Sequence, residues 1–206
     1  MDGPRPVEVL ERLREAGAVA LRGNTDRAIV EGADDESPGG DDGENAALAW
    51  QRECLGETWL QWLHDLPFAL RFGEGADGLL VVHANPKTDD EHIWPDATDA
   101  FLERVTDGVV ERTIAFGHLH LPYVRAWRDR LLVDVSSAGL PKDGDPRASY
   151  AILTQRSGGW QVKHRRVDFD VEKVLRDIEK SGMPDRDQRL KVLRRHRYKQ
   201  LAERIP

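Results

Sequence analysis

The stretch Thr113-Ile114-Ala115-Phe116-Gly117-His118-Leu119-His120 joins an apolar run to a pair of histidines. The run predicts a buried strand, and the glycine after it lets another group approach the backbone closely. Because residues i and i+2 of an extended chain share a face, His118 and His120 are expected to point the same way. Two imidazoles at a strand exit are a common way to hold a metal ion, although a His-x-His pair also occurs as a surface or capped loop feature.

Two other apolar stretches lead into metal-capable side chains. Val19–Arg22 is interpreted as a strand that ends in Gly23-Asn24-Thr25-Asp26, and Leu79–Val82 as a buried strand that ends at His83. Ligands of open α/β sheets bind outside the carboxyl ends of the strands, and nitrogen and oxygen donors suit Zn, Mn or Fe. Taken singly, the first group is also typical of a turn or helix N-cap, and His83 of a hydrogen-bonded strand-end residue. Together they favour a metal centre.

These blocks resemble the motifs of the calcineurin-like metallophosphoesterases, especially the small prokaryotic phosphodiesterase-like members. The family series is Asp-x-His, Gly-Asp, Gly-Asn-His-Asp, a lone His and Gly-His-x-His. Gly23 to Asp26 resembles the third block, His83 the fourth and Gly117 to His120 the fifth, while residues 137–150 resemble the strand-loop-strand segment that follows. The resemblance covers residues 3–170 and implies an α/β fold, the four-layer α-β-β-α sandwich.

The chain departs from this pattern at two places. The Asp-x-His and Gly-Asp blocks, which in the family supply most ligands of one ion and a bridging aspartate, are absent, and residues 1–6 resemble the segment that follows Gly-Asp. We therefore expect a sandwich that lacks its first strand or strands, with a natural short form as the alternative. Such a chain is expected to be poorly soluble and nearly inactive, because an apolar strand edge would be left unpaired. Thr25 stands where many members have a histidine that assists as proton donor, and a threonine hydroxyl does not titrate in the useful range.

The resemblance also implies a set of site residues. Asn24, His83 and His118 would bind one divalent ion and His120 a second, while Asp26, the candidate catalytic residue, would orient its neighbours rather than ligate. The family implies two ions (Mn, Fe, Zn or Ni) in the complete protein, with one ion or none in this chain. The expected function is hydrolysis of a phosphate ester, a phosphodiester above all. The alternative is a non-catalytic metallophosphoesterase-like protein with an incomplete site that acts in binding or regulation.

Composition limits the partners and the location. A net charge of −7 argues against nonspecific binding to nucleic acid. The arginine-rich residues 186–204 leave a nucleic-acid-binding module open, against an amphipathic helix that packs Leu190, Leu193 and Leu201. The single Cys54 cannot form an internal disulfide, and neither a membrane-spanning apolar run nor a signal peptide is present, so we expect no membrane partner and a cytoplasmic location. Nothing in the sequence indicates an oligomeric state.

Periodicity predicts the remaining elements. Helices are expected at residues 6–16, 45–55, 57–66, 97–106 and 171–180, and strand pairs at 68–72 with 79–82, 123–127 with 131–135, and 149–155 with 160–167. Trp50, Trp59 and Trp62 are expected to pack on the sheet, and residues 31–44 to form a flexible acidic loop. The predicted domains are a metallophosphoesterase domain at 1–170, incomplete at its N-terminus, and a C-terminal helical extension at 171–206 that packs on it or trails from it.

Overall fold

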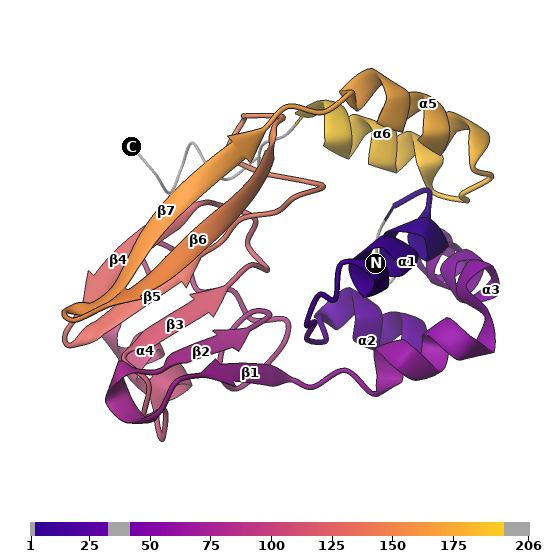
Figure 1. Cartoon of the computed structure of the whole chain (residues 1–206). Coiled ribbons are helices and arrows are strands. Elements are labelled where there is room, and N and C mark those ends of the chain that lie inside the picture. The colour runs from indigo at the N-terminus through magenta and orange to yellow at the C-terminus, as the bar shows by residue number, and fades with distance from the viewer. Residues whose placement is uncertain (1–2, 33–41, 196–206) are drawn as a thin grey trace. The chain divides into compact units, whose positions relative to one another are not determined.

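The computed structural model describes residues 3–32 and 42–195 (Figure 1). Its helices are α1 (Pro6–Glu15), α2 (Asn24–Glu31), α3 (Asp42–His64), α4 (Asp99–Thr106), α5 (Val171–Lys180) and α6 (Arg186–Arg195), with a 3-10 turn at Gly75–Asp77. Its strands are β1 (Ala69–Phe72), β2 (Leu79–Val82), β3 (Thr113–Phe116), β4 (Tyr123–Trp127), β5 (Arg130–Asp134), β6 (Ala148–Arg156) and β7 (Gly159–Val167). The chain forms two compact units: of the described residues, unit 1 holds those up to Pro67 together with Asp170–Arg194, and unit 2 holds Phe68–Phe169 and Arg195.

A five-stranded sheet in the order β1-β2-β3-β5-β4 forms the centre of unit 2. The three inner strands are parallel: Leu80 of β2 lies opposite Ile114 of β3, and Ala115 of β3 lies opposite Val133 of β5. The two outer strands, β1 and β4, pair antiparallel with β2 and β5. Because the inner strands run the same way, the segments that leave the carboxyl ends of β2 and β3 meet at one edge of the sheet.

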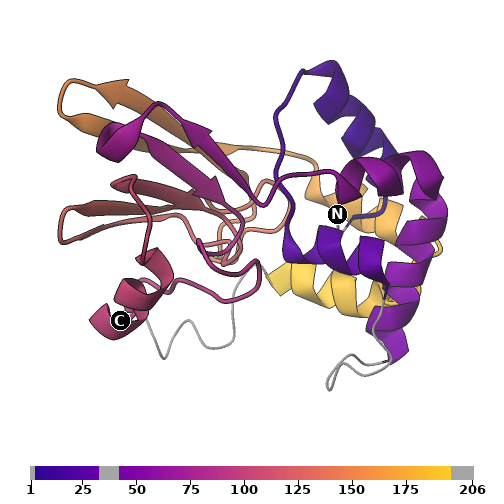
Figure 2. The ribbon, with the colours of Figure 1, turned by 90° about the horizontal axis from the view of Figure 1, so that it is seen from below.

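Each face of this sheet is covered by a different element. Alternate strand residues such as Leu80, Ile114 and Leu132 pack with Leu102 and Val105 of α4. The intervening residues, which include Leu79, Ala115 and Val133, pack with the hairpin side chains Leu153, Trp160 and Val162. Successive strand residues point to opposite faces, so α4 and the β6–β7 hairpin lie on opposite sides of the sheet, as Figure 2 shows from below. Unit 2 therefore has the layer succession helix, sheet, sheet.

Unit 1 is helical. Leu10 of α1, Ile29 of α2 and Leu55, Trp59 and Leu63 of α3 form its buried apolar cluster. Arg52 of α3 donates to the carbonyl groups of Ile29 and Val30, which stabilises the carboxyl end of α2. Helix α3 bends at Gly56, whose φ of 64° and ψ of 175° are not helical, so it contains the two helices predicted on either side of this residue.

Two predictions about unit 1 were wrong. The strand expected at Val19–Arg22 does not form, and in its place residues 18–23 are irregular with a hydrogen bond from the Arg22 N–H to the Pro67 carbonyl at 2.9 Å. A strand needs a neighbour along its whole length, and this segment has none among the described residues. Trp59 and Trp62 pack among the helices, where their rings meet edge to face at 5.9 Å, instead of on the sheet.

The other expectations have mixed outcomes. The helix at residues 171–180 and the strand at 113–116 form as predicted, and Leu190 and Leu193 are buried on α6. Most of the acidic loop, together with Leu201 and the last basic residues, lies outside the described residues. The predicted domain boundary at residue 170 coincides with the return of the chain to unit 1, but a domain at 1–170 stays a prediction. Within the described ranges, no helix is long and apolar enough to cross a membrane.

Candidate metal centre

His83 and His118 come together where strands β2 and β3 end. The backbone N–H groups of Gly117 and His118 both donate to the His83 carbonyl oxygen, at 2.9 and 3.0 Å. A Cβ on Gly117 would lie 3.3 Å from the Ser136 carbonyl oxygen, so a glycine suits this close packing. The His83 Nε2 and His118 Nδ1 atoms are 3.0 Å apart. The parallel sheet therefore brings together two of the histidines expected at its carboxyl edge.

The Gly-His-x-His block differs from the extended chain that its spacing predicted. Strand β3 stops at Phe116, and the chain turns so that the His120 N–H donates to the Gly117 carbonyl at 3.2 Å. Leu119 enters the core with 1% exposure, and His120 has a left-handed φ of 62°. The prediction that His118 and His120 lie in extended chain was therefore wrong. The His83 carbonyl accepts the N–H groups of Gly117 and His118, and the chain turns at the end of the strand.

Backbone carbonyl groups determine which ring nitrogens carry protons. The His118 Nε2 lies 2.9 Å from the Asp90 carbonyl oxygen, and the His120 Nδ1 lies 2.8 Å from that of Leu140. A carbonyl oxygen can only accept, so each of these nitrogens donates its hydrogen. In the neutral ring this leaves the lone pair on His118 Nδ1 and on His120 Nε2. Metal-binding histidines in proteins have this arrangement, in which the second nitrogen donates to a backbone carbonyl or carboxylate.

Burial keeps both rings neutral. It lowers the pKa of His118 against the opposing charges of Asp90 and Asp89, and it lowers the pKa of His120 to about 4, assisted by the Lys142 ammonium. A neutral imidazole is the form that binds a metal ion.

The spacing of the two facing nitrogens fits a common ion. Two nitrogens that each lie ~2.1 Å from one ion, at an angle of about 90–110°, are roughly 3.0–3.4 Å apart. The His83–His118 separation of 3.0 Å is at the lower end of this range. Within the part of the chain that the structure describes, no group of three or more His, Cys, Asp or Glu side chains is spaced to hold an ion. The geometry thus fits a pair of nitrogen ligands and shows no complete coordination shell.

Comparisons with known proteins agree with this architecture. No protein-family model matches the chain. An uncharacterised protein of Methanocaldococcus jannaschii is 25% identical over 202 residues, which are 89% of this chain and 78% of the relative. A hypothetical protein of Pyrococcus horikoshii OT3 has a similar structure, with a TM-score of 0.78, 21% identity and coverage of 93% of this chain and 80% of that one. A metallophosphoesterase from Sphaerobacter thermophilus matches with a TM-score of 0.70 and 25% identity, over 94% of this chain and 83% of that one. This protein has the metallophosphoesterase fold. The predicted resemblance to the calcineurin-like family is confirmed.

Two of the residues that the metallophosphoesterase motifs single out lie in unit 1. Gly23 is the N-cap of α2, Asn24 is its first residue, and the Asp26 carboxylate accepts the Gly23 N–H at 3.0 Å. The residues Gly23 to Asp26, which resemble the third motif block, thus also form a helix N-terminus, as the alternative interpretation of a turn or N-cap proposed. Asp26 holds the backbone at the start of α2, and its orienting role at a metal site stays a prediction. The joint role of Asn24 and the histidines stays a prediction.

Sequence reasoning missed several neighbours of the histidine pair. The His92 and His118 ring centroids lie 4.3 Å apart with planes tilted by 39°, and Trp94 meets His92 edge to face at 5.5 Å. Both belong to residues 83–98, a long connection between β2 and α4 without helix or strand. Long irregular connections in compact domains are often functional, and that signal, with the run Asp89-Asp90-Glu91-His92, could have identified them.

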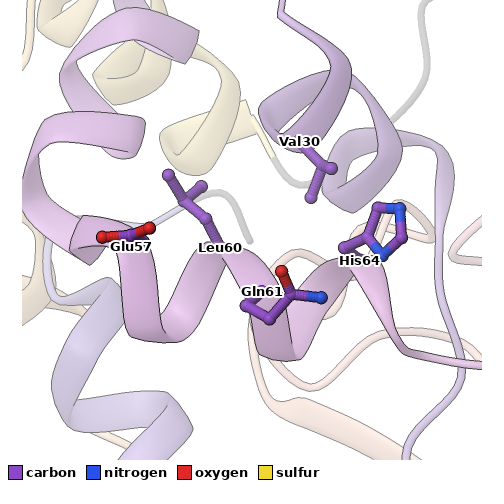
Figure 3. Close-up of a pocket in the computed structure, with 5 residues that line it drawn as sticks. All are labelled: Val30, Glu57, Leu60, Gln61 and His64. Atoms are coloured by element: carbon purple, nitrogen blue, oxygen red, sulfur yellow. The ribbon is translucent and has the colours of Figure 1, made fainter.

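Unit 1 contains a pocket of about 270 Å³ whose lining residues are distinct from the predicted metal-binding residues. Val30, Glu57, Leu60, Gln61 and His64 line it, from α2 and the second half of α3 (Figure 3). His64 is an exposed residue whose Nδ1 lies 3.0 Å from the Asp65 carboxylate. None of the predicted metal-binding residues lines this pocket.

Proposed function

We propose that this protein is a metal-dependent phosphoesterase and that its substrate is a phosphodiester. The observation that carries the proposal is the pair of facing nitrogens of His83 and His118 at adjacent parallel strand ends. A second support is the similarity to a metallophosphoesterase of known structure. The proposed ligands are those that the motif resemblance implies: Asn24, His83 and His118 for one ion and His120 for another.

The chain's own residues would prepare the site. His118 and His120 are held by the Asp90 and Leu140 carbonyl groups, so their remaining nitrogens are presented as lone-pair donors. His83 would shift its proton to Nδ1, since its Nε2 now shares a hydrogen bond with His118. Divalent ions, when bound, polarise a phosphoryl oxygen and lower the pKa of a water that attacks phosphorus.

Lys142 is the cation placed to attract the substrate. Its backbone N–H donates to the His120 carbonyl at 3.0 Å, and its ammonium is close enough to lower the pKa of His120. The side chain is half-buried. We expect it to bind a phosphate oxygen that carries negative charge.

The test is hydrolysis of bis(p-nitrophenyl) phosphate with added Mn²⁺. We expect turnover that stops in chelator, and a loss of at least ~100-fold in His118→Ala, because second-shell changes alone cost 10–100-fold. His64→Ala is the matched control, since it removes an exposed histidine from the other unit. Full activity in chelator, or equal activity of His118→Ala and His64→Ala at fixed metal, would contradict the proposal.

One observation favours a second candidate, a non-catalytic protein that keeps the fold. Among the described residues no group of three ligands is assembled, and a pair of neutral histidines holds a divalent ion weakly. Measured Mn²⁺ content separates the two candidates: a protein that purifies and folds but neither retains Mn²⁺ nor hydrolyses the phosphodiester would support the second.

A further inference from the structure

The irregular segment at residues 83–98 is held in place by its own buried amide. Asn85 has no exposed surface. Its Oδ1 accepts the N–H groups of Lys87 and Thr88 at 2.8 and 3.0 Å, and its Nδ2 donates to the Glu91 carbonyl at 2.8 Å. These bonds close the first half of the segment into a fixed loop, so its shape does not depend on regular secondary structure.

The second half of the segment is attached to strand β4. The Tyr123 hydroxyl donates to the Ile93 carbonyl at 2.6 Å, and the Arg125 guanidinium donates to the Pro95 and Ala97 carbonyls at 3.0 and 2.8 Å. The Ile93 side chain is 1% exposed and belongs to the core between the sheet and α4. Residues 92 and 94, on either side of this anchor, are therefore held in a fixed place.

His92 and Trp94 lie beside the histidine pair. The His92 ring is 4.3 Å from the His118 ring, tilted by 39°, and the Trp94 ring stands nearly perpendicular to His92 at 5.5 Å. Both side chains are half-buried and keep part of their surface exposed. Aromatic residues with a fixed orientation are efficient binding elements because few rotamers are lost when they bind a ligand.

We propose that His92 and Trp94 form an aromatic shelf that binds the flat aromatic group of the substrate, so that the substrate is a phosphate ester of a nucleoside or an aryl alcohol. This inference rests on the proposed function, because the shelf adjoins the nitrogens proposed to hold the ion. Stacking of a base on an aromatic side chain tolerates many rings. Asp89 and Asp90 are on the same segment, and their negative charge favours a neutral ring there over a second phosphate.

Binding measurements on the full chain in Mn²⁺ test the shelf without requiring turnover. The probes are adenosine 5′-monophosphate, phenyl phosphate and ribose 5-phosphate, which share a phosphate and differ in the ring. We expect at least one aromatic probe to bind ~10-fold or more tighter than ribose 5-phosphate. Tight binding of both aromatic probes would assign a simple aryl site, and tight binding of the nucleotide alone would assign a nucleobase site.

Variants of Trp94 locate the preference. Trp94→Leu should bring the aromatic probes to within about threefold of ribose 5-phosphate, and Trp94→Phe should keep most of the preference. Trp50→Leu, on helix α3 of unit 1, is the matched control and should leave the preference unchanged. The melting temperature of each variant reports whether it folds. The comparison of the three probes on the wild-type protein tests the aromatic preference even if a variant does not fold.

The outcomes for the shelf and for the enzyme are separable. Equal wild-type affinities for all three probes, or a preference that survives in Trp94→Leu, would overturn the shelf even if bis(p-nitrophenyl) phosphate is hydrolysed. A ring preference that depends on Trp94 would support the shelf even if no phosphodiester is hydrolysed, and in that case only the proposed function fails.

Discussion

At the scale of single residues, Asp134 is a carboxyl group in an unusual place. It ends strand β5 with no exposed surface, and its Oδ1 accepts the Ser136 N–H at 2.7 Å. In the described part of the chain its Oδ2 has no hydrogen-bond partner. Burial raises the pKa of Asp134 well above its ordinary value, against the opposing hydrogen bond from the Ser136 N–H. The Ser136 hydroxyl in turn donates to the His120 carbonyl at 3.1 Å, so this carboxyl group is linked through Ser136 to the turn that carries the histidines.

We predict that Asp134→Asn changes how stability depends on pH. Above about pH 4 the unfolded chain loses the Asp134 proton while the folded protein retains it, so the free energy of unfolding of the wild type falls as pH rises, until the folded pKa is passed. Asparagine is isosteric with the protonated acid and removes this dependence. Urea unfolding should show the two proteins most alike near pH 4. Between pH 4 and the folded pKa of Asp134, the free energy of unfolding of Asp134→Asn should rise relative to that of the wild type by up to ~1.4 kcal/mol per pH unit.

Asp129→Asn is the control for this measurement. Asp129 is an exposed residue in the turn between β4 and β5, so Asp129→Asn makes the same chemical change at a site without burial. An Asp134→Asn protein that differs from the wild type by the same free energy at pH 4 and pH 8 would show that residue 134 is ionised throughout.

At the scale of elements, helix α3 shows how one residue directs a chain. Gly56 interrupts the helix with a φ of 64°, and a Cβ built on it meets no atom within 4 Å. Space is therefore available for a side chain, but the backbone conformation is one that only glycine adopts easily. The bend lets Leu55 and Trp59, on either side of it, join one apolar cluster with α1 and α2.

We expect Gly56→Ala to destabilise the protein through the backbone alone. The φ of 64° and ψ of 175° at Gly56 lie in a region that essentially only glycine occupies, which costs an L-residue of order 1–3 kcal/mol, and the lower entropy of the unfolded alanine chain returns roughly 0.4–1 kcal/mol. A decrease of about 1 kcal/mol in the free energy of unfolding should follow, measured by urea titration. Gly158→Ala, in an ordinary conformation with equal open space, should change it by less than about 0.5 kcal/mol. An equal effect of both substitutions would contradict the strain argument.

At the scale of the whole molecule, the two units differ in how they are built from the chain. The described part of unit 2 is the stretch Phe68–Phe169 together with Arg195, and both faces of its sheet are covered by elements of that stretch. Unit 1 is discontinuous: its second part, Asp170–Arg194, contributes α5 and most of α6, and Asp177 of α5 forms an ion pair with Arg5 at 2.8 Å.

We predict that residues 68–169 fold on their own. A stretch of chain that carries its own apolar core is expected to unfold cooperatively. The measurement is circular dichroism of this fragment, which should show β-sheet signal and a sigmoidal melting curve. A fragment of residues 1–67, which lacks α5 and α6, should have a lower melting temperature than the fragment 68–169. A fragment 68–169 with a featureless melting curve would show that the sheet needs the rest of the chain.

The sequence by itself determined the elements that depend on local pattern. Strand β3 and helix α5 have the predicted bounds, and the bend at Gly56 falls between the helices predicted at residues 45–55 and 57–66. It also determined that His83 and His118 leave strand ends, because each follows a run of apolar residues. That these ends meet depends on β2 and β3 being parallel neighbours, which the structure shows.

Only the tertiary structure decided the rest, because the decisive partners are far apart in the chain. Val19–Arg22 has the composition of a strand, but pairing depends on a neighbour that no local pattern supplies. The turn at His118 and His120 arises from the His83 carbonyl, and the position of His92 arises from a loop that Asn85 and Tyr123 hold. A local pattern records which conformation a segment prefers, whereas a site is made by hydrogen bonds and ring contacts between segments, whose geometry exists only once the chain has folded.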